Sequence, residues 1–126
     1  MASDLEANKK NVVEFYDLII NKKDFESARK YMGDRYKQHN PRVADGPDGL
    51  RTHIEDLKAN FPDVRSEIKK IIAEGEYVVL HVHSRRTPKR QLAIIEIFRL
   101  ENGKIAEHWD VVQEIPDSPL NSNGMF

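Results

Sequence analysis

The sequence predicts an α+β domain in which helices cover one face of a curved antiparallel sheet. Apolar residues in the first half of the chain recur at helical spacing, whereas from Val64 onward they alternate with a period of two. Turn residues at Glu74-Gly75 and at Asn102-Gly103 divide the second half into hairpins, so neighbouring strands are expected to be antiparallel. A run of helices followed by a run of strands is the order typical of this fold class.

Two helices are expected before residue 34. The first begins at a capping box formed by Ser3 and Glu6 and continues to about Ile20. The second starts near Asp24 and ends at Gly33, because glycine commonly terminates a helix. The apolar face of this second helix consists of Phe25, Ala28, Tyr31 and Met32.

A third helix and four strands make up the rest of the domain. The helix follows a turn at residues 45–47 and ends before Pro62. Its single apolar face consists of Leu50, Ile54, Leu57 and Phe61. Alternating or β-branched and aromatic segments then predict strands at residues 66–72, 77–84, 92–100 and 104–115.

Size and composition limit what the protein can be. Its 126 residues suffice for one domain, residues 1–126, with a tail at residues 116–126 that we expect to lie over the domain or a partner subunit. The net charge of -1 makes nucleic acid an unexpected partner, and the absence of cysteine excludes a thiolate nucleophile. No segment is signal-like or reaches about 18 apolar residues, so we expect no membrane partner and a cytoplasmic location.

The turn around Asn102 decides which side chains share a face with His108 and Asp110. A two-residue type I′ turn would leave Glu96 beside Trp109, away from that pair. A three-residue turn closed by a bulge at Gly103 would instead pair Glu96 with His108. We favour the bulge, which gathers on one face Glu96, Phe98, His108 and Asp110.

The other face of this hairpin is expected to be a partner surface. It carries Ile95, Ile97, Trp109 and Val111, a set too apolar for bare sheet facing solvent. Since a large exposed apolar patch usually marks an interface, we predict a homodimer through this face. On the neighbouring strand His81 and His83 share a face, and if it is that of Glu96, the concave side holds three histidines and two carboxylates.

Asp110 and His108 form the candidate acid/base pair, because residues two apart on a strand point to the same side. An ionised carboxylate in a strand between Trp109 and Val111 is costly to bury unless it is paired. Asp110 is therefore either a general acid or base with a raised pKa, or a structural carboxylate bonded to His108 or a backbone amide. We favour the acid/base interpretation of Asp110. Because His108 lies beside Asp110, we favour a functional role for His108 as well.

Other polar residues also have two interpretations. His39 and Asn40, in the loop at residues 38–41, can hydrogen-bond a ligand carbonyl or cap a turn before proline. His81 and His83 are spaced like a metal-binding pair that a carboxylate would complete, but spacing alone gives no ligand geometry, and we expect no metal.

The basic segment at residues 85–90 can recruit an anionic ligand at a pocket rim, although a solvated hairpin loop is the simpler explanation. His53 lies beside the apolar face of the third helix and is interpreted as a helix-edge residue outside the site.

Together these elements resemble the SnoaL-like polyketide cyclase family of the NTF2-like superfamily. The resemblance spans nearly the whole chain and is carried by residues 38–41, 96–99, 102–105 and, most specifically, 107–111. It implies a cone-shaped fold, usually dimeric, in which three helices and the curved sheet enclose a pocket.

The resemblance also implies chemistry. In the cyclases an aspartate matching Asp110 acts as the acid/base in an aldol closure, without a metal or organic cofactor. Carried over, Asp110 would remove a proton next to a carbonyl, and His108 with His39 or Asn40 would orient the substrate or stabilise the enolate. The residues expected to line the pocket are His81, His83, Glu96 and Phe98.

The expected substrate is a small, apolar, carbonyl-containing metabolite, converted by proton transfer of the aldol or isomerisation type. A non-catalytic binding module and a dimeric adaptor of the same fold are the alternatives. Two departures from the family matter. The short basic segment at residues 84–90 argues against a large aromatic polyketide, and Glu96, in place of the common aspartate, moves a carboxylate deeper into the pocket.

Overall fold

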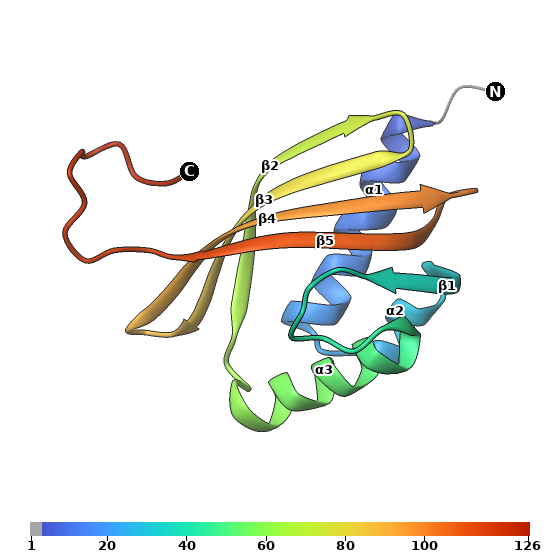
Figure 1. The fold of residues 1–126 in the computed structure, drawn as a ribbon, viewed down its shortest axis with the longest axis horizontal. Coiled ribbons are helices and arrows are strands. Elements are labelled where there is room, and N and C mark those ends of the chain that lie inside the picture. The colour runs from blue at the N-terminus through green and yellow to red at the C-terminus, as the bar shows by residue number, and fades with distance from the viewer. Residues whose placement is uncertain (1–3) are drawn as a thin grey trace.

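A computed structural model describes residues 4–126, and in this part of the chain the helices pack on one face of a strongly twisted sheet (Figure 1). The elements are, in order, α1 (Leu5–Tyr16), the π-helix η1 (Asp17–Asn21), α2 (Phe25–Arg29), β1 (Met32–Gln38), α3 (Gly46–Asn60), β2 (Arg65–Glu74), β3 (Tyr77–Thr87), β4 (Arg90–Glu101) and β5 (Lys104–Glu114). The predicted α+β class is confirmed.

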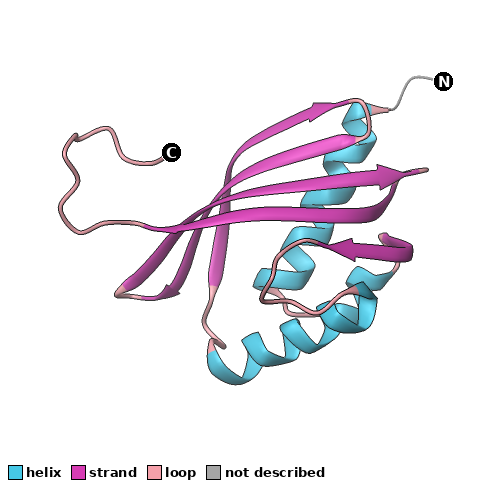
Figure 2. Ribbon diagram, viewed as in Figure 1, coloured by secondary structure: helices cyan, strands magenta, loops and turns pink. Residues whose placement is uncertain are grey.

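The sheet has five strands within residues 4–126, in the order β1-β5-β4-β3-β2 (Figure 2). β1 is parallel to β5, and every other neighbouring pair is antiparallel. The concave face packs against α1 and α3. The side chains there with the least exposure are Phe15, Phe98, Ile54, Leu57, Leu80, Leu100, Ile105, Val12, Val64, Val78, Val82 and Ser84. No helix in this part of the chain is long and apolar enough to cross a membrane.

The continuous helical segment formed by α1 and η1 is fixed at both ends by side chains. Asp4 is its N-cap and accepts the amide of Ala7 at 3.0 Å, while the predicted capping residue Ser3 lies outside the described residues. At the other end, Asn21 donates to the carbonyl of Ser66 at 3.0 Å and accepts its amide at 2.8 Å. These two bonds attach the helix end to β2, so the helix backs the sheet where the cavity lies.

The predicted second helix is wrong beyond Arg29. Met32 begins β1 instead, opposite Ile105 of β5, and the amide of Ile105 donates to the carbonyl of Tyr31 at 2.8 Å. The segment MGDRYKQ has no clear apolar period, so pairing with the free edge of β5 decides its structure. Gly33 therefore lies inside a strand.

The β4–β5 hairpin closes by a different turn from the one we favoured. Asn102 (φ 52°) and Gly103 (φ 77°) form a two-residue turn that places Leu100 opposite Ile105. Next to this turn the register shifts by one residue, because Leu100 pairs with Ile105 but Arg99 pairs with Glu107. This shift is a β-bulge. The prediction of a three-residue turn with its bulge at Gly103 is therefore wrong.

The predicted grouping of side chains on one face is nevertheless right. Phe98 lies opposite His108, and Glu96 lies opposite Asp110. We expected Glu96 opposite His108, so the observed pairing is displaced by two residues. Because side chains alternate with a period of two, that displacement changes the partners and preserves the face.

Candidate functional site

A cavity of about 70 Å³ lies between the concave face of the sheet and the helices α1, η1 and α3. A larger hollow of about 500 Å³ adjoins it. Asn40, His53, Arg86 and Asp110 line both spaces, so the outer hollow connects the cavity with the surface. The volume of the inner space suits a small ligand or the reacting end of a larger one.

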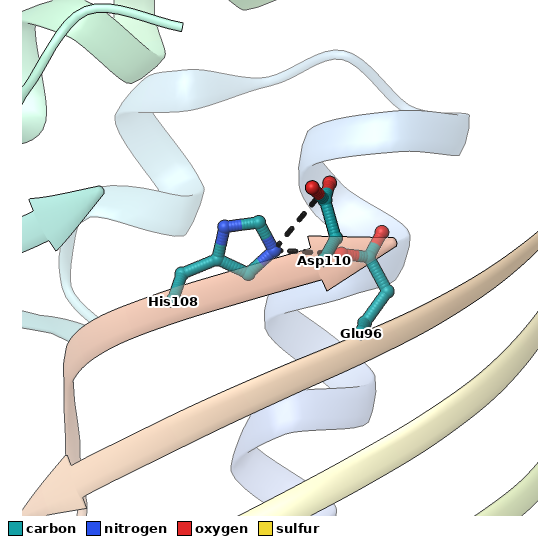
Figure 3. A group of neighbouring side chains, drawn as sticks. All are labelled: Glu96, His108 and Asp110. Carbon is teal, nitrogen blue, oxygen red and sulfur yellow. Dashed lines mark hydrogen bonds and ion pairs between the residues drawn. The ribbon is translucent and has the colours of Figure 1, made fainter. Parts of the chain in front are cut away.

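Three titratable side chains meet on the sheet wall of this cavity (Figure 3). Glu96 comes from β4, and His108 and Asp110 come from β5. Nε2 of His108 lies 2.6 Å from Oε1 of Glu96 and 3.9 Å from Oδ2 of Asp110. Glu96 is 5% exposed and His108 is 7% exposed, so this cluster is shielded from bulk water.

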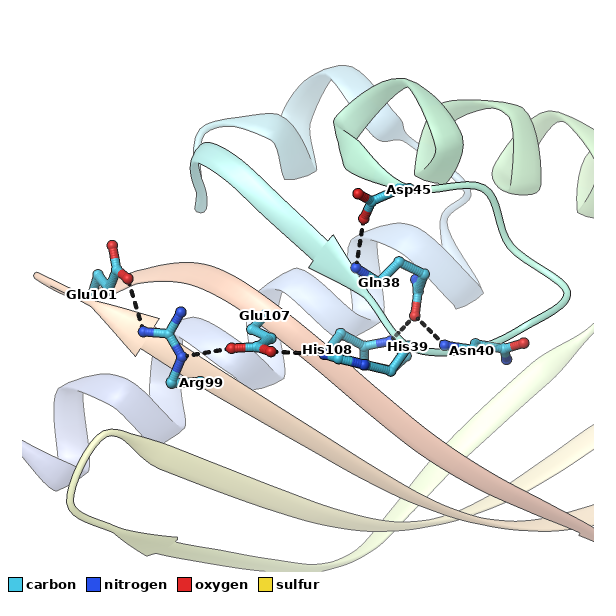
Figure 4. Close-up of polar contacts among 8 residues, drawn as sticks. All are labelled: Gln38, His39, Asn40, Asp45, Arg99, Glu101, Glu107 and His108. Atoms are coloured by element: carbon cyan, nitrogen blue, oxygen red, sulfur yellow. Dashed lines mark hydrogen bonds and ion pairs between the residues drawn. The ribbon is translucent and has the colours of Figure 1, made fainter.

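The other ring nitrogen of His108 is held by Gln38 at the end of β1 (Figure 4). His108 Nδ1 lies 2.7 Å from Oε1 of Gln38, which also accepts the amide of Asn40 at 2.9 Å. The amide group of Gln38 completes its bonding by donating to Oη of Tyr36 at 3.4 Å. Since the Gln38 oxygen is an acceptor in both bonds, Nδ1 of His108 carries a proton.

This bond fixes how the proton between His108 and Glu96 is shared. With Nδ1 protonated, the short contact at Nε2 holds one proton, carried either by the imidazolium or by the Glu96 carboxyl. Burial lowers the pKa of His108, but its hydrogen bond to Glu96 and the charges of Glu96 and Asp110 outweigh burial and raise that pKa above 6.5. The imidazolium form is therefore more stable here than for a solvated histidine.

Asp110 stands at the mouth of the inner cavity with a single strong side-chain partner. Asn40 donates its side-chain N–H to Oδ2 of Asp110 at 3.0 Å. Burial, followed by the negative charge of Glu96, raises the pKa of Asp110 above 3.8, while His108 and Asn40 oppose the shift. Asp110 is thus a carboxyl group whose proton affinity exceeds that of a solvated aspartate.

The same three side chains are also a possible cation site. Their ligand atoms, one from each of Glu96, His108 and Asp110, lie within 4.8 Å of one another. One imidazole and two carboxylates are a donor set that a divalent transition metal accepts. In the observed geometry Nε2 of His108 is instead directed at Glu96 within hydrogen-bond distance, so metal binding would require this contact to open.

The prediction that His81 and His83 line the pocket is wrong. His81 lies opposite Ile95 and His83 opposite Ala93, which places both rings on the convex face. There the ring of Phe126 packs on His83, with centroids 4.7 Å apart. The alternative metal site that joined these histidines to Glu96 or Asp110 is excluded too, because the sheet lies between them. The fully buried inward side chains of β3 are Val78, Leu80, Val82 and Ser84.

His39 also points away from the cavity, contrary to prediction. Its Nε2 lies 2.7 Å from Oε2 of Glu107, and its ring stacks on Trp109 with centroids 4.8 Å apart. Glu107 in turn accepts from Nε of Arg99 at 2.9 Å (Figure 4). Gln38 and Asn40, on either side of His39, contact His108 and Asp110, so the flanking residues face inward and His39 faces outward. Of the two predicted loop residues, only Asn40 reaches the cluster.

Several polar residues of the cavity were not assigned to the site from the sequence, among them Gln38, His53 and Arg86. Gln38 could have been found by applying the two-residue alternation to the loop. His53 lines the cavity from α3, although it was interpreted as a helix-edge residue. Arg86 was expected in a solvated loop, but β3 extends to Thr87, and the Arg86 side chain reaches the cavity.

The fold and the enclosed titratable cluster define an NTF2-like α+β domain. The sequence matches the SnoaL-like polyketide cyclase family over residues 10–116. The chain therefore belongs to this family, as the sequence resemblance indicated. No curated protein sequence matches it closely enough to be counted as a relative.

Solved structures share the fold at low sequence identity. A protein from Kribbella flavida provisionally named a ketosteroid isomerase has a TM-score of 0.77 and 13% identity, covering 94% of this chain and 87% of that chain. TsrD from Streptomyces laurentii has a TM-score of 0.71 and 23% identity, covering 84% and 88%. IdmH from Streptomyces antibioticus, provisionally named a polyketide cyclase, has a TM-score of 0.68 and 17% identity, covering 83% and 91%.

Proposed function

We propose that this protein is a cofactor-independent cyclase or isomerase that moves a proton on a small carbonyl compound. Asp110 is the proposed general base, and it removes a proton from the carbon next to the carbonyl. The observation that carries the proposal is a carboxyl group with a raised pKa at a cavity wall, oriented by Asn40. A base with a pKa closer to neutral can both accept and return a proton, as such reactions require.

The neighbouring groups have complementary roles in this proposal. The Glu96–His108 pair supplies a buried, proton-sharing dipole beside Asp110. As negative charge leaves Asp110 and appears on the enolate oxygen, the imidazolium stabilises it electrostatically. Gln38 and Tyr36 do not contact the reacting atoms in this scheme and act as positioning residues for His108. Phe98 packs against the His108 ring, with centroids 4.9 Å apart, and shields it from water.

Hydrogen–deuterium exchange tests the proposal without knowledge of the natural substrate. A panel of small methyl ketones is incubated with the protein in D2O, and loss of the proton signal next to the carbonyl is followed by NMR. We expect exchange above the buffer rate in the wild type and no excess exchange in Asp110→Asn. Asp117→Asn, at an exposed position, is the matched control and should exchange like the wild type.

The result also separates catalysis from the non-catalytic alternative. A binding module would shift the ketone or protein NMR signals without accelerating exchange, and Asp110→Asn would change nothing in the exchange rate. That outcome, with the Asp117→Asn control folded and equally inactive, would refute the catalytic proposal.

We further propose that the convex face forms a homodimer. An apolar hollow of about 590 Å³ there is lined by His39, Tyr77, Val79, Ile97, Trp109, Asp110 and Val111. Val111 is 72% exposed, and Ile95 and Tyr77 are also exposed. Covering these side chains with an identical face would remove apolar surface from water in a closed, two-fold assembly.

Sedimentation velocity tests the dimer. Val111→Glu is expected to shift a dimer toward monomer, because it places a charge on each side of the interface. Leu120→Glu is the matched control, since Leu120 is fully exposed and lies in the tail after β5. A wild-type protein that sediments as a monomer across the accessible concentration range would contradict the proposal. If the wild type is monomeric and binds another protein through this face, the adaptor alternative gains support.

A further inference from the structure

Arg86 differs from the other arginines of the β3–β4 hairpin in lacking a charged partner. Arg85 pairs with Glu67 at 3.8 Å, and Arg90 pairs with Glu114 at 3.0 Å. Arg86 forms no ion pair with any residue from 4 to 126, and its Nε, although buried, has no hydrogen-bond partner there. The positive charge of Arg86 therefore has no carboxylate partner within the described chain, unlike the charges of Arg85 and Arg90.

The guanidinium of Arg86 is directed into the site. Arg86 lines the inner cavity and the outer hollow, and its carbon Cζ lies 5.8 Å from the ring centre of Phe61. Burial lowers the pKa of Arg86, while Tyr16, Glu96 and Asp110 partly compensate. The Nε of this half-buried cation loses hydration that no hydrogen bond within the described chain replaces.

The hydroxyl groups of two serines beside Arg86 also lack a hydrogen-bond partner. Ser84, two residues earlier on β3, is 1% exposed, and its Oγ has no hydrogen-bond partner within the described chain. Ser66 lies directly opposite Ser84 on β2, and the same holds for its Oγ. Both line the inner cavity. A buried hydroxyl left without a partner costs about 1–3 kcal/mol, so two of them beside an open guanidinium need an explanation.

The three open groups have one requirement in common. Arg86 Nε can only donate, and the hydroxyls of Ser84 and Ser66 can donate, so oxygen acceptors would satisfy all three. A neutral carbonyl would leave the Arg86 charge uncompensated, whereas a carboxylate supplies two acceptor oxygens and one negative charge. The inner cavity of about 70 Å³ limits the bound group to a short chain.

We propose that the substrate of this site is a small carbonyl compound that also carries a carboxylate. Arg86 and Ser84 bind the carboxylate on one wall of the cavity, with Ser66 beside them. This leaves the carbon next to the carbonyl to face Asp110. The inference rests on the proposed proton-transfer function and adds the class of substrate. It replaces the expectation of a purely apolar ligand.

Binding of a matched pair of ligands tests this proposal. Levulinate and levulinamide have the same carbon chain and ketone, and they differ in whether the end group is charged. Their dissociation constants are measured by NMR titration of the wild type, Arg86→Gln and Arg85→Gln. We expect the wild type to bind levulinate at least about tenfold more tightly than the amide, as for one charge-assisted hydrogen bond. Arg86→Gln should abolish this preference.

Arg85→Gln is the matched control, because it removes the same charge one residue away on the other face of β3. It should retain the preference for levulinate. Equal weakening by both substitutions would show attraction to net charge alone and would overturn the proposal. Levulinate and levulinamide binding equally, or neither binding, would overturn it too. Ser84→Ala provides a second variant with the positive charge kept, and it should weaken levulinate binding and leave the amide unaffected.

The failure of this inference can be distinguished from failure of the proposed function. Levulinate binding through Arg86 without deuterium exchange would support the anion site and refute the catalytic role. Exchange of neutral methyl ketones at the same rate as levulinate, unchanged in Arg86→Gln, would support the catalytic role and refute the anion site.

Discussion

Gln38 accepts a hydrogen bond from Nδ1 of His108 at 2.7 Å, although 70 positions separate the two residues in the chain. The contact exists because β1 runs parallel to β5, with Gln38 opposite His108 in the register. The same oxygen of Gln38 accepts the Asn40 amide, and Asn40 in turn holds Asp110. One short edge strand therefore sets the orientation of both proposed acid/base groups.

Gln38→Leu should destabilise the protein and release the His108 tautomer. The substitution leaves the N–H groups of buried His108 and half-buried Asn40 without their acceptor, at about 1–3 kcal/mol for the buried one. Urea unfolding measures the stability, and nitrogen-15 NMR of the imidazole reports the tautomer. Gln113→Leu, at an exposed site on β5, is the control. An unchanged His108 spectrum in Gln38→Leu would contradict the assigned role.

Asp110→Asn should stabilise the fold at neutral pH while abolishing activity. The pKa of Asp110 is raised in the folded state by burial and by Glu96, so ionising it costs more in the folded than in the unfolded chain. Its contribution to stability is present below the unfolded pKa and is lost as pH rises through the folded pKa. Asparagine cannot ionise, so it removes that loss at every pH above the folded pKa. Thermal unfolding of both proteins at pH values on either side of this window checks the sign.

His108 should make the stability of the wild type fall as the solution becomes alkaline. Its folded pKa is raised, despite burial, by the hydrogen bond to Glu96 and by the charges of Glu96 and Asp110. The stabilisation is complete below pH 6.5, the unfolded value, and disappears as pH rises through the higher folded value. In Glu96→Gln the decline over this window should be smaller. A decline of equal size would mean that other groups cause it.

Gly49→Ala should destabilise the protein because α3 approaches the preceding loop too closely for a methyl group. A Cβ at Gly49 would lie 1.9 Å from the carbonyl oxygen of Ala44, and this is backbone that cannot rotate away. Overpacking of this kind costs about 1–3 kcal/mol. Gly33→Ala is the control, because its nearest neighbour atom would be 3.8 Å away. Urea unfolding distinguishes the two, and comparable losses in both would refute the steric explanation.

The parts of the fold that the sequence predicted are those decided by local periodicity. The third helix and the four later strands follow from spacing alone. The common face of Glu96, Phe98, His108 and Asp110 also depends on how the hairpin closes, and the bulge next to the two-residue turn produces it. β1 could not be predicted, because its only partner is a strand more than 60 residues later in the chain. Its sequence, MGDRYKQ, is mostly polar and lacks the two-residue apolar alternation that would indicate a strand.

The site was predictable to the same extent. Asp110 and His108 share a face because they are two apart, which is a local property. The orientation of His81 and His83 depends on the register between β3 and β4, and no local signal fixes that register across a ten-residue segment. Arg86 was missed because a long side chain at a strand end can turn inward or outward, and only the packing around it decides which.

The extended stretch at residues 38–40 has a consequence for how the two faces of the sheet influence each other. Gln38 and Asn40 hold the proposed acid/base groups inside, while His39, between them, stacks on Trp109 in the hollow of the convex face. Two peptide units thus join the outer ring to the inner contacts, so a displacement of the His39 backbone would reach both Gln38 and Asn40. A second subunit that docks on the convex face would act on proton transfer mechanically, through the backbone, with no contact to the ligand.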